Sequence, residues 1–348
     1  MSNDGIPSPT ACDAIPKVEL HCHVEGAVRA ATVVELARKN GRTLPTRDPH
    51  DLYRYSSLDT FLEIFWLVQE LVVDRSDWAR IAYEATVDAH AHGLRYRELF
   101  FTPARHLAAG RSLADIIAGL SEGLVAAERE TGVRSALICD VDKAFGPAAA
   151  VELAEELALL KAAGRAELVI GLGMDSTERG VDHRAFAMAC AVARRSGLRL
   201  TGHAGEDGGP DTIRICLDVL GLERIDHGIA VMDDPALVER MARDRIPLTV
   251  CPSSNILIAN RYPTLLEHPF RAMRDAGLLA TINTDDPAMT DLDLGREYAA
   301  VGSAMGYSYD ELCAIAIDAI DATWLDATDR AALRAAFEGE IAGLTAPA

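Results

Sequence analysis

The chain has 348 residues, of which 49 % are hydrophobic, so it can bury the core of one barrel-sized domain or of two smaller ones. Its formal net charge of −19 disfavours binding to nucleic acid or to an acidic membrane and favours a small neutral or cationic ligand. No stretch approaches the roughly 18 continuous apolar residues of a transmembrane helix, and the amino terminus lacks a signal-peptide pattern, so we expect a cytoplasmic protein. No two cysteines form a Cys-x-x-Cys pair, so we expect neither disulfides nor a structural zinc cluster.

The amino-terminal part of the chain predicts a short lead-in followed by one strand. Residues 1–15 are polar and contain prolines, which favours a flexible segment ahead of a single domain at residues 16–348. The first strand lies in the run KVELHCHVEG, where alternation places His21 and His23 together on the face opposite the apolar residues. Such a strand offers two imidazoles to one metal ion. Two histidines at the end of a half-exposed strand are the simpler alternative.

Helical spacing dominates the next part of the chain. It extends over residues 30–40 and, after a proline-containing connection, over residues 58–92, where Ser57 or Asp59 is a plausible N-cap. The second stretch is longer than a crossover between two strands needs. We therefore expect part of residues 58–92 to form a lid over the end of the first strand, with a helical insertion that only packs as the alternative.

From residue 96 onward strands and helices alternate regularly. The expected strands lie at residues 96–101, 135–140, 167–173, 198–203, 224–227, 247–250 and 279–285. The expected helices between them lie at residues 113–131, 148–163, 185–196, 211–220, 235–243 and 264–276. With the first strand, this pattern predicts an α/β fold, a parallel (β/α)8 barrel of the TIM type. Residues 291–348 continue as helices that pack outside the barrel, without a linker to a second domain.

Side chains that can bind a metal end four of the expected strands. His21 and His23 end the first strand, His203 the fifth, His227 the sixth and Asp285 the eighth. Because catalytic groups gather at the carboxyl ends of the strands in such a barrel, these side chains are expected to meet at one rim. Three imidazoles and one carboxylate suit Zn²⁺, which lowers the pKa of a bound water toward ~7 and so supplies hydroxide for a hydrolysis.

Further residues near these strand ends are candidates for acid–base chemistry. Residues 167–173 contain no lysine to bridge two ions, so we expect one Zn²⁺ per chain. Glu206 can act as an acid if a dry site keeps its carboxyl group protonated, and a surface glutamate is the alternative. His227 can orient or deprotonate the attacking water, or it can be an ordinary core histidine. Glu19 and Asp226 are better interpreted as structural.

Five sequence motifs carry a family resemblance: PKVELHCHVEGA at residues 16–27, HAGE at 203–206, RIDHG at 224–228, LTVCP at 248–252 and NTDDP at 283–287. In this order they resemble the adenosine and adenine deaminases of the metal-dependent hydrolase superfamily. The resemblance implies a Zn²⁺-containing barrel whose ion is bound by His21, His23, His203 and Asp285. It also implies that Glu206 protonates N1 of a purine, that His227 assists the attacking water, and that Asp286 hydrogen-bonds N7.

The resemblance also supplies the substrate class, a 6-aminopurine that loses ammonia to give a 6-oxo product. Glu25 stands where adenosine deaminases have an aspartate that contacts the ribose, and residues 174–178 (MDSTE) resemble a run found in adenine deaminases. Residues 286–289 (DPAM) lack the aromatic-glycine run common in adenine deaminases. We expect adenosine or a related adenine nucleoside as substrate, with free adenine or a 5′-modified adenosine, such as aminodeoxyfutalosine, as alternatives. The substrate-binding candidates are Glu25, Gly173, Ser176 and Asp286.

Two rival classes of protein are disfavoured by the same residues. A barrel that had lost catalysis and served only for binding would not need every metal and acid–base position filled. A zinc site of the cytidine-deaminase type needs His-x-Glu and Pro-Cys-x-x-Cys, which the chain lacks. The expected partner is a small-molecule 6-aminopurine, with no nucleic acid and no membrane, and the oligomeric state is open.

Overall fold

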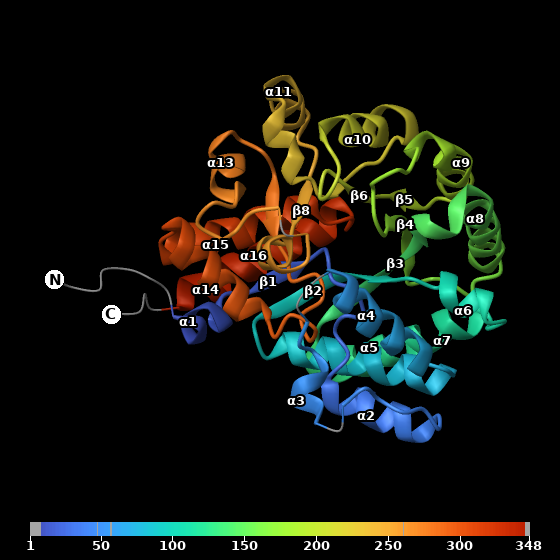
Figure 1. Ribbon diagram of the computed structural model, residues 1–348. Coiled ribbons are helices and arrows are strands. Elements are labelled where there is room, and N and C mark those ends of the chain that lie inside the picture. The colour runs from blue at the N-terminus through green and yellow to red at the C-terminus, as the bar shows by residue number, and fades with distance from the viewer. Residues whose placement is uncertain (1–7, 47, 56–57, 260, 345–348) are drawn as a thin grey trace.

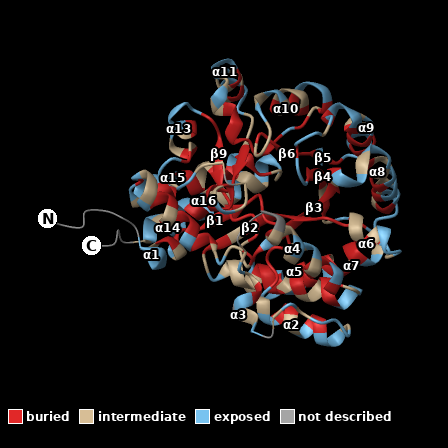
Figure 2. Ribbon diagram, viewed as in Figure 1, coloured by how far each residue is buried: buried red, intermediate tan, exposed pale blue. Residues whose placement is uncertain are grey.

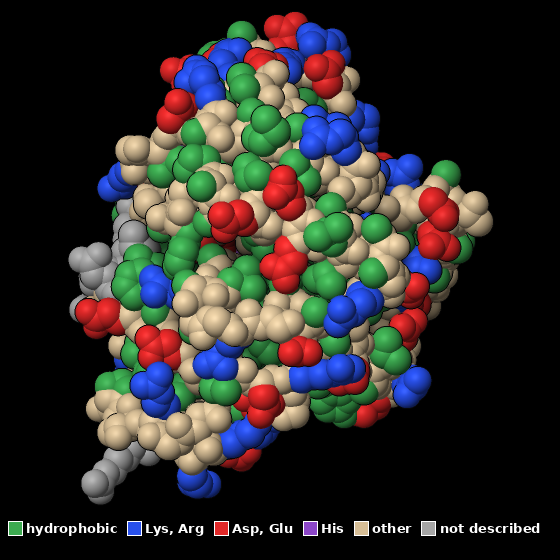
Figure 3. Space-filling view, turned by 90° about the vertical axis from the view of Figure 1, so that its right-hand side faces the viewer, with side chains coloured by type: hydrophobic (Ala, Val, Ile, Leu, Met, Phe, Trp, Pro, Cys, Tyr) green, Lys and Arg blue, Asp and Glu red, His purple; other side chains and the backbone are tan. Residues whose placement is uncertain are grey.

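The computed structural model describes residues 8–46, 48–55, 58–259 and 261–344. The strands form a parallel (β/α)8 barrel of the TIM type, with helices packed around it (Figure 1). Buried residues follow the strands and the inward faces of the surrounding helices (Figure 2). On the face shown in Figure 3, acidic and basic side chains are interspersed rather than gathered into a field of one sign. Among the described residues, no helix has the length and apolarity needed to cross a membrane.

All strand pairs are parallel. One sheet has the order β1 (Lys17–Glu19), β2 (Leu94–Phe101), β3 (Arg134–Asp142), β4 (Val169–Asp175) and β5 (Arg199–Leu200). The other has the order β6 (His203–Ala204), β7 (Ile225–His227), β8 (Leu248–Val250) and β9 (Ala280–Ile282). The expected fifth strand is thus interrupted at Thr201 and Gly202 and continues as β6. The barrel therefore has eight strand paths, as predicted.

The barrel closes between its last and first strands at the rim that carries the histidines. The N–H of Asp285 donates to the carbonyl of His21 at 3.1 Å, and the N–H of His23 donates to the carbonyl of Asp285 at 2.8 Å. β1 itself ends at Glu19, and the N–H of Leu20 donates to the side-chain oxygen of Asn283 at 2.8 Å. His21 and His23 do lie together, as predicted, but a break in the strand intervenes, so regular alternation is not the reason.

The helices before the C-terminal group are α1 (Pro9–Ala14), α2 (Ala30–Lys39), α3 (Pro49–Leu52), α4 (Leu58–Leu71), α5 (Arg75–His90), α6 (Ala104–Ala108), α7 (Leu113–Thr131), α8 (Gly146–Ala162), α9 (Ala187–Arg195), α10 (Pro210–Ile215), α11 (Pro235–Asp244), α12 (Pro252–Leu257) and α13 (Phe270–Asp275). The prediction for α7 is confirmed at both ends. Ser112 caps it by accepting a hydrogen bond from the N–H of Asp115, and Gly132 ends it with a φ of 77°. The helix expected at residues 264–276 is shorter, because only α13 is helical.

The segment expected to be a lid divides into two helices with different neighbours. Asp74 begins α5 with a capping box, and α5 packs against α7 as an outer helix of the barrel. α4 instead lies near the end of β1, where the Gln69 side chain hydrogen-bonds Glu25. Of the two proposed N-caps, Ser57 lies outside the described residues, and the side chain of Asp59 is likewise not described.

The two ends of the described chain pack against the barrel. Residues 1–7 are outside the described part, but α1 is a helix capped by Ser8, and its Cys12 is buried against α14 (Leu294–Met305). This differs from the flexible lead-in expected for residues 1–15, because a buried side chain fixes the helix. α15 (Tyr309–Asp318) and α16 (Ala327–Gly343) complete the C-terminal group of helices.

The connection between α15 and α16 reaches the amino-terminal end of β7. There Arg224 donates to the Glu98 carboxylate at 2.6 Å, and both side chains are fully buried. The Trp324 ring lies 4.1 Å from the guanidinium of Arg224, and the N–H of Trp324 donates to Glu98 at 2.6 Å. The C-terminal segment therefore covers a buried ion pair that joins β2 to β7.

Candidate active site

Five predicted side chains meet at the carboxyl-terminal rim of the barrel. Nε2 of His21 lies 3.2 Å, and Nε2 of His23 3.4 Å, from the same oxygen of Asp285. The ring centre of His203 lies 4.8 Å from that of His21 and 4.7 Å from that of His227. All five residues are buried, although they lie in, or just after, four different strands of the barrel.

These residues fit a divalent metal ion such as Zn²⁺. Ligand atoms of His21, His23 and Asp285 lie within 4.8 Å of one another, as do those of His21, His203 and His227. Nε2 of His21 and Nε2 of His203 are buried without a hydrogen-bond partner, a state that normally costs about 1–3 kcal/mol and that an ion would relieve. Burial lowers the pKa of His23 to about 4 and the pKa of His203 well below its ordinary value, so both imidazoles keep a lone pair for a metal.

Neighbouring groups orient the first of these histidines. Nδ1 of His21 lies 3.2 Å from the hydroxyl oxygen of Thr249, and that hydroxyl donates its own hydrogen to Asp226 at 2.6 Å. The Thr249 oxygen must therefore accept from Nδ1, which leaves Nε2 of His21 unprotonated and turned toward Asp285. The structural interpretation of Asp226 agrees with this contact. Ser254 donates to the other oxygen of Asp285 at 2.6 Å.

Backbone strain is concentrated at this rim. Among the described residues, the non-glycine positions with a left-handed backbone include Ser176, His227 and Asp285, with φ values of 72°, 60° and 65°. Such a conformation costs of order 1–3 kcal/mol at a residue with a side chain, and it is found mainly where function requires it. Here it turns His227 and Asp285 into the site as their strands end.

Glu206 lies beside the histidines on a loop that a second glutamate holds in place. Its carboxylate is 3.7 Å from Nδ1 of His203 and 3.6 Å from Nε2 of His227. Glu178 accepts hydrogen bonds from three successive N–H groups of this loop, those of Gly205 at 2.7 Å, Glu206 at 2.8 Å and Asp207 at 3.3 Å. Burial and the nearby Asp285 raise the pKa of Glu206 well above its ordinary value. This shift favours the protonated form of the group, which can donate a proton.

The four predicted substrate-binding residues differ in their burial and in their hydrogen-bond partners. Asp286 is buried with one carboxylate oxygen unpartnered, and burial followed by the charge of Asp285 raises its pKa. Glu25 is fully buried and accepts a hydrogen bond from the N–H of Thr102 at 2.9 Å. Gly173 is buried near the end of β4, beside Asp140. Ser176, by contrast, is exposed.

Gly173 shows why a glycine is needed at the end of β4. A Cβ atom there would lie 2.0 Å from a carboxylate oxygen of Asp140, which is fully buried on β3. The other oxygen of Asp140 lies 3.6 Å from Nδ1 of His23. Asp140 was not predicted as a site residue, because a single acid inside a strand pattern carries no signal of its partner. It faces Nδ1 of His23, whereas Nε2 of that ring faces Asp285.

Three other residues at the site also escaped the sequence analysis. Glu178 occurs in the MDSTE run but was not assigned a role there, Gln69 lies on α4, and Asn255 lies on α12 with its amide nitrogen 2.9 Å from Nδ1 of His227. Only the MDSTE run offered a signal. The contacts of Gln69 and Asn255 join segments far apart in the chain, so local spacing does not reveal them.

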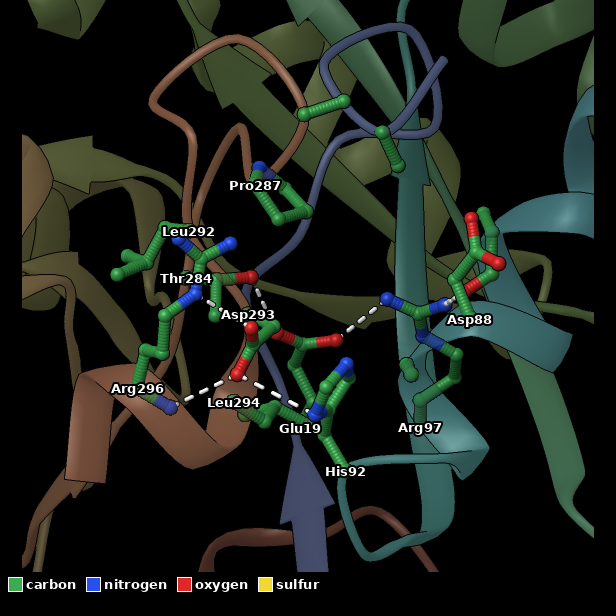
Figure 4. A pocket seen from close by; sticks show the side chains of 14 residues that line it. Glu19, Asp88, His92, Arg97, Thr284, Pro287, Leu292, Asp293, Leu294 and Arg296 are labelled. Carbon is green, nitrogen blue, oxygen red and sulfur yellow. Dashed lines mark hydrogen bonds and ion pairs between the residues drawn. The ribbon is translucent and has the colours of Figure 1, made fainter. Parts of the chain in front are cut away.

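A separate pocket of about 210 Å³ lies between β1, α5 and residues 284–296 (Figure 4). None of the candidate site residues lines it. Figure 4 shows Glu19 between Arg97 and Thr284, and both of these side chains bond to its carboxylate. Glu19 thus has the structural role that was expected.

The comparisons with known proteins agree with this geometry. The family model described as adenosine deaminase matches residues 16–338. An adenine deaminase of Streptomyces coelicolor is 37 % identical over 339 residues, which cover 96 % of this chain and 97 % of that protein. The crystal structure of an adenine deaminase from Arthrobacter aurescens is 29 % identical, with a TM-score of 0.88, over 94 % of this chain and 99 % of that one.

A second solved structure bears on the metal. It is an amidohydrolase from Burkholderia ambifaria with bound Zn, 32 % identical, with a TM-score of 0.88, over 95 % of this chain and 92 % of that one. The family match and these relatives extend over nearly the whole chain and include all the motifs at the rim of the barrel. The chain therefore belongs to the adenosine deaminase family.

Proposed function

We propose that this protein is a metal-dependent hydrolase that converts a 6-aminopurine and water to the 6-oxopurine and ammonia, with free adenine as its preferred substrate. The observation that carries the proposal is the position of Glu206, a buried carboxyl group with a raised pKa that lies 3.6 Å from His227 and next to a set of side chains that can bind a metal. We further propose one Zn²⁺ per chain and a cytoplasmic location.

The chain's own residues supply the proton transfers. A Zn²⁺ held by His21, His23, His203 and Asp285 would make the attacking water more acidic. Protonated Glu206 donates to N1 of the purine, which makes C6 more electrophilic. Burial and the charge of Asp285 raise the pKa of Asp286 as well. In its protonated form Asp286 donates to N7, which only accepts hydrogen bonds.

The choice of adenine over adenosine rests on the relatives and on Glu25. Adenosine or a related nucleoside was the first expectation, but the similar proteins from Streptomyces coelicolor and Arthrobacter aurescens are named adenine deaminases. Glu25 stands where a ribose-binding aspartate is expected, and its carboxylate is already bonded to the N–H of Thr102 and to Gln69. Its other oxygen, Oε2, is buried without a hydrogen-bond partner. Because glutamate is one methylene longer than aspartate, this carboxylate reaches further into the space that a ribose would occupy, which favours free adenine.

An ultraviolet screen tests this assignment. Adenine, adenosine, 2′-deoxyadenosine and 5′-modified adenosines are compared by loss of the 6-amino chromophore, with Glu206→Gln as the matched control for contaminating activity. We expect kcat/KM for adenine to exceed that for adenosine by about 10²-fold, since unpaired polar contacts each cost about 1–3 kcal/mol. A preference for any nucleoside would refute the choice of adenine, and turnover of no aminopurine would refute the proposed reaction.

A further inference from the structure

A chain of hydrogen bonds leads from the backbone to His227. The N–H of Phe270 donates to Nδ1 of His268 at 3.2 Å, and Nε2 of His268 lies 3.1 Å from the amide oxygen of Asn255. The amide nitrogen of Asn255 lies 2.9 Å from Nδ1 of His227. All three side chains are buried. The other nitrogen of His227, Nε2, faces the carboxylate of Glu206.

The backbone end of this chain fixes the direction of every hydrogen bond in it. A backbone N–H can only donate, so Nδ1 of His268 is unprotonated and Nε2 carries the hydrogen. That hydrogen is donated to the amide oxygen of Asn255, and the amide N–H₂ therefore faces His227 and donates to Nδ1. Burial lowers the pKa of His268 to about 4, so a doubly protonated ring does not disturb this order near neutral pH.

We propose that Asn255 and His268 are positioning residues that hold His227 in the neutral form with its hydrogen on Nε2, so that His227 offers the reaction centre a hydrogen-bond donor and not a base. In the other neutral form, a hydrogen on Nδ1 would point at the amide hydrogens of Asn255. Turning the amide over would only move the conflict to His268, where two donors would then meet. One backbone N–H thus controls a ring that is three hydrogen bonds away.

This position of the hydrogen limits what His227 can do in the reaction. The role described here depends on the proposed deamination. Its Nε2–H can hydrogen-bond to the oxygen of the attacking water but cannot remove a proton from it. After Glu206 has given its proton to N1, its carboxylate is the base that remains beside His227. Glu206 then takes one proton from the water and passes it to the amino group, which leaves as ammonia. As the C6=O bond forms, the remaining proton of the C6 hydroxyl passes to Glu206, so that N1 keeps its hydrogen in the 6-oxopurine and Glu206 is protonated again.

The hydrogen on His227 can be observed without any turnover. Two-bond ¹H–¹⁵N correlation spectra of zinc-loaded enzyme labelled with ¹⁵N-histidine distinguish Nε2–H from Nδ1–H, and the His227 signals are identified by their loss in His227→Gln. We expect Nε2–H in the wild type. A wild type with its hydrogen on Nδ1 would overturn the proposal, whatever the enzyme's substrate proves to be.

Substitutions at the two positioning residues test the cause. In Asn255→Asp, a carboxylate accepts from both histidines, so the hydrogen of His227 should move to Nδ1. If the enzyme deaminates a purine, kcat should then fall about 10²–10³-fold with KM changed less than threefold, as for the loss of one preorganised donor. A kcat within threefold of the wild type, or a hydrogen that stays on Nε2, would contradict the proposal.

A matched pair at His268 covers the case in which Asn255→Asp does not fold. His268→Gln keeps a side-chain N–H that can donate to the Asn255 oxygen. His227 should therefore keep its hydrogen on Nε2, and the variant should keep most of the wild-type kcat. His268→Leu removes that donor and should give a mixture of the two forms. Circular dichroism and zinc content establish that both variants are folded. Identical His227 spectra in the two variants would show that His268 does not set the proton position.

Discussion

Replacing Glu178 by Gln tests whether the loop that carries Glu206 is held in its working position from outside the site. One carboxylate oxygen of Glu178 accepts from Gly205, and the other accepts from Glu206 and Asp207. A glutamine has a single acceptor oxygen, so its NH₂ group must face at least one of these N–H groups. The change also removes one of the negative charges that raise the pKa of Glu206.

The expected size of the effect follows from the hydrogen bonds lost. A hydrogen bond to a charged group contributes about 1.5–3 kcal/mol, and the same energy lost from the transition state would lower kcat/KM roughly tenfold to a hundredfold. We expect that loss in an ultraviolet deamination assay with adenine, together with an unchanged zinc content, because Glu178 does not belong to the candidate ligand set.

A control for this experiment exists on the outside of the barrel. Glu311 accepts a hydrogen bond from the N–H of Ser308 at 2.7 Å in the capping box of α15, so Glu311→Gln makes the same chemical change at a distant backbone contact. It should lower the free energy of unfolding by about 1 kcal/mol and leave kcat/KM unchanged. The reasoning fails if Glu178→Gln stays within twofold of the wild type, or if both variants lose activity alike.

Four further variants give separate readouts. His21→Ala should lose activity and also bound zinc, measured by elemental analysis. Glu206→Gln should keep zinc, and its kcat should fall about 10²–10⁴-fold. A Glu206→Gln enzyme with near wild-type turnover would exclude Glu206 as the acid. Glu25→Asp should change the ratio of kcat/KM for adenosine to kcat/KM for adenine by about tenfold to a hundredfold. A ratio within twofold of the wild-type ratio would show that Glu25 does not determine this selectivity. Burial raises the pKa of Glu297 from 4.5 to about 7, so the folded protein keeps a proton that the unfolded chain releases, and stability falls as the pH rises across that interval. Glu297→Gln should remove up to about 3 kcal/mol of that fall, measured by urea unfolding at pH 5 and pH 8, and an equal fall in both proteins would contradict it.

The sequence predicted the parts of this molecule that depend on local pattern. The helix at residues 113–131 has a serine cap and a terminal glycine, so both ends were readable. The metal-binding candidates were readable because each ends a strand, and a barrel brings strand ends together. The gap at Thr201 and Gly202 was not readable, since an apolar run predicts a strand but does not say whether its neighbours pair with it throughout.

The parts that escaped prediction depend on contacts between distant segments. Asp140 looks like any acid in a strand until β1 places His23 beside it. Asn255 and His268 are 28 and 41 residues beyond His227, and only the fold joins them into one line of hydrogen bonds. The helix expected from residue 264 begins only at Phe270. The residues before it form turns, in which the N–H of Glu267 donates to Thr264 and the N–H of His268 to Leu265, and Pro269 has no N–H with which to continue them.

The cover over the ion pair of Arg224 and Glu98 has a consequence for biosynthesis. Trp324 contacts both partners, yet it follows both β2 and β7 in the chain and is made after them. During translation, β2 and β7 are complete well before this segment leaves the ribosome. The nascent barrel therefore passes through a stage in which the ion pair of Arg224 and Glu98 is still exposed to water. A chain that stops before Trp324 would stay at that stage, with its catalytic rim assembled and its opposite end open. Loss of the C-terminal segment should therefore show itself as poor yield and aggregation rather than as altered selectivity.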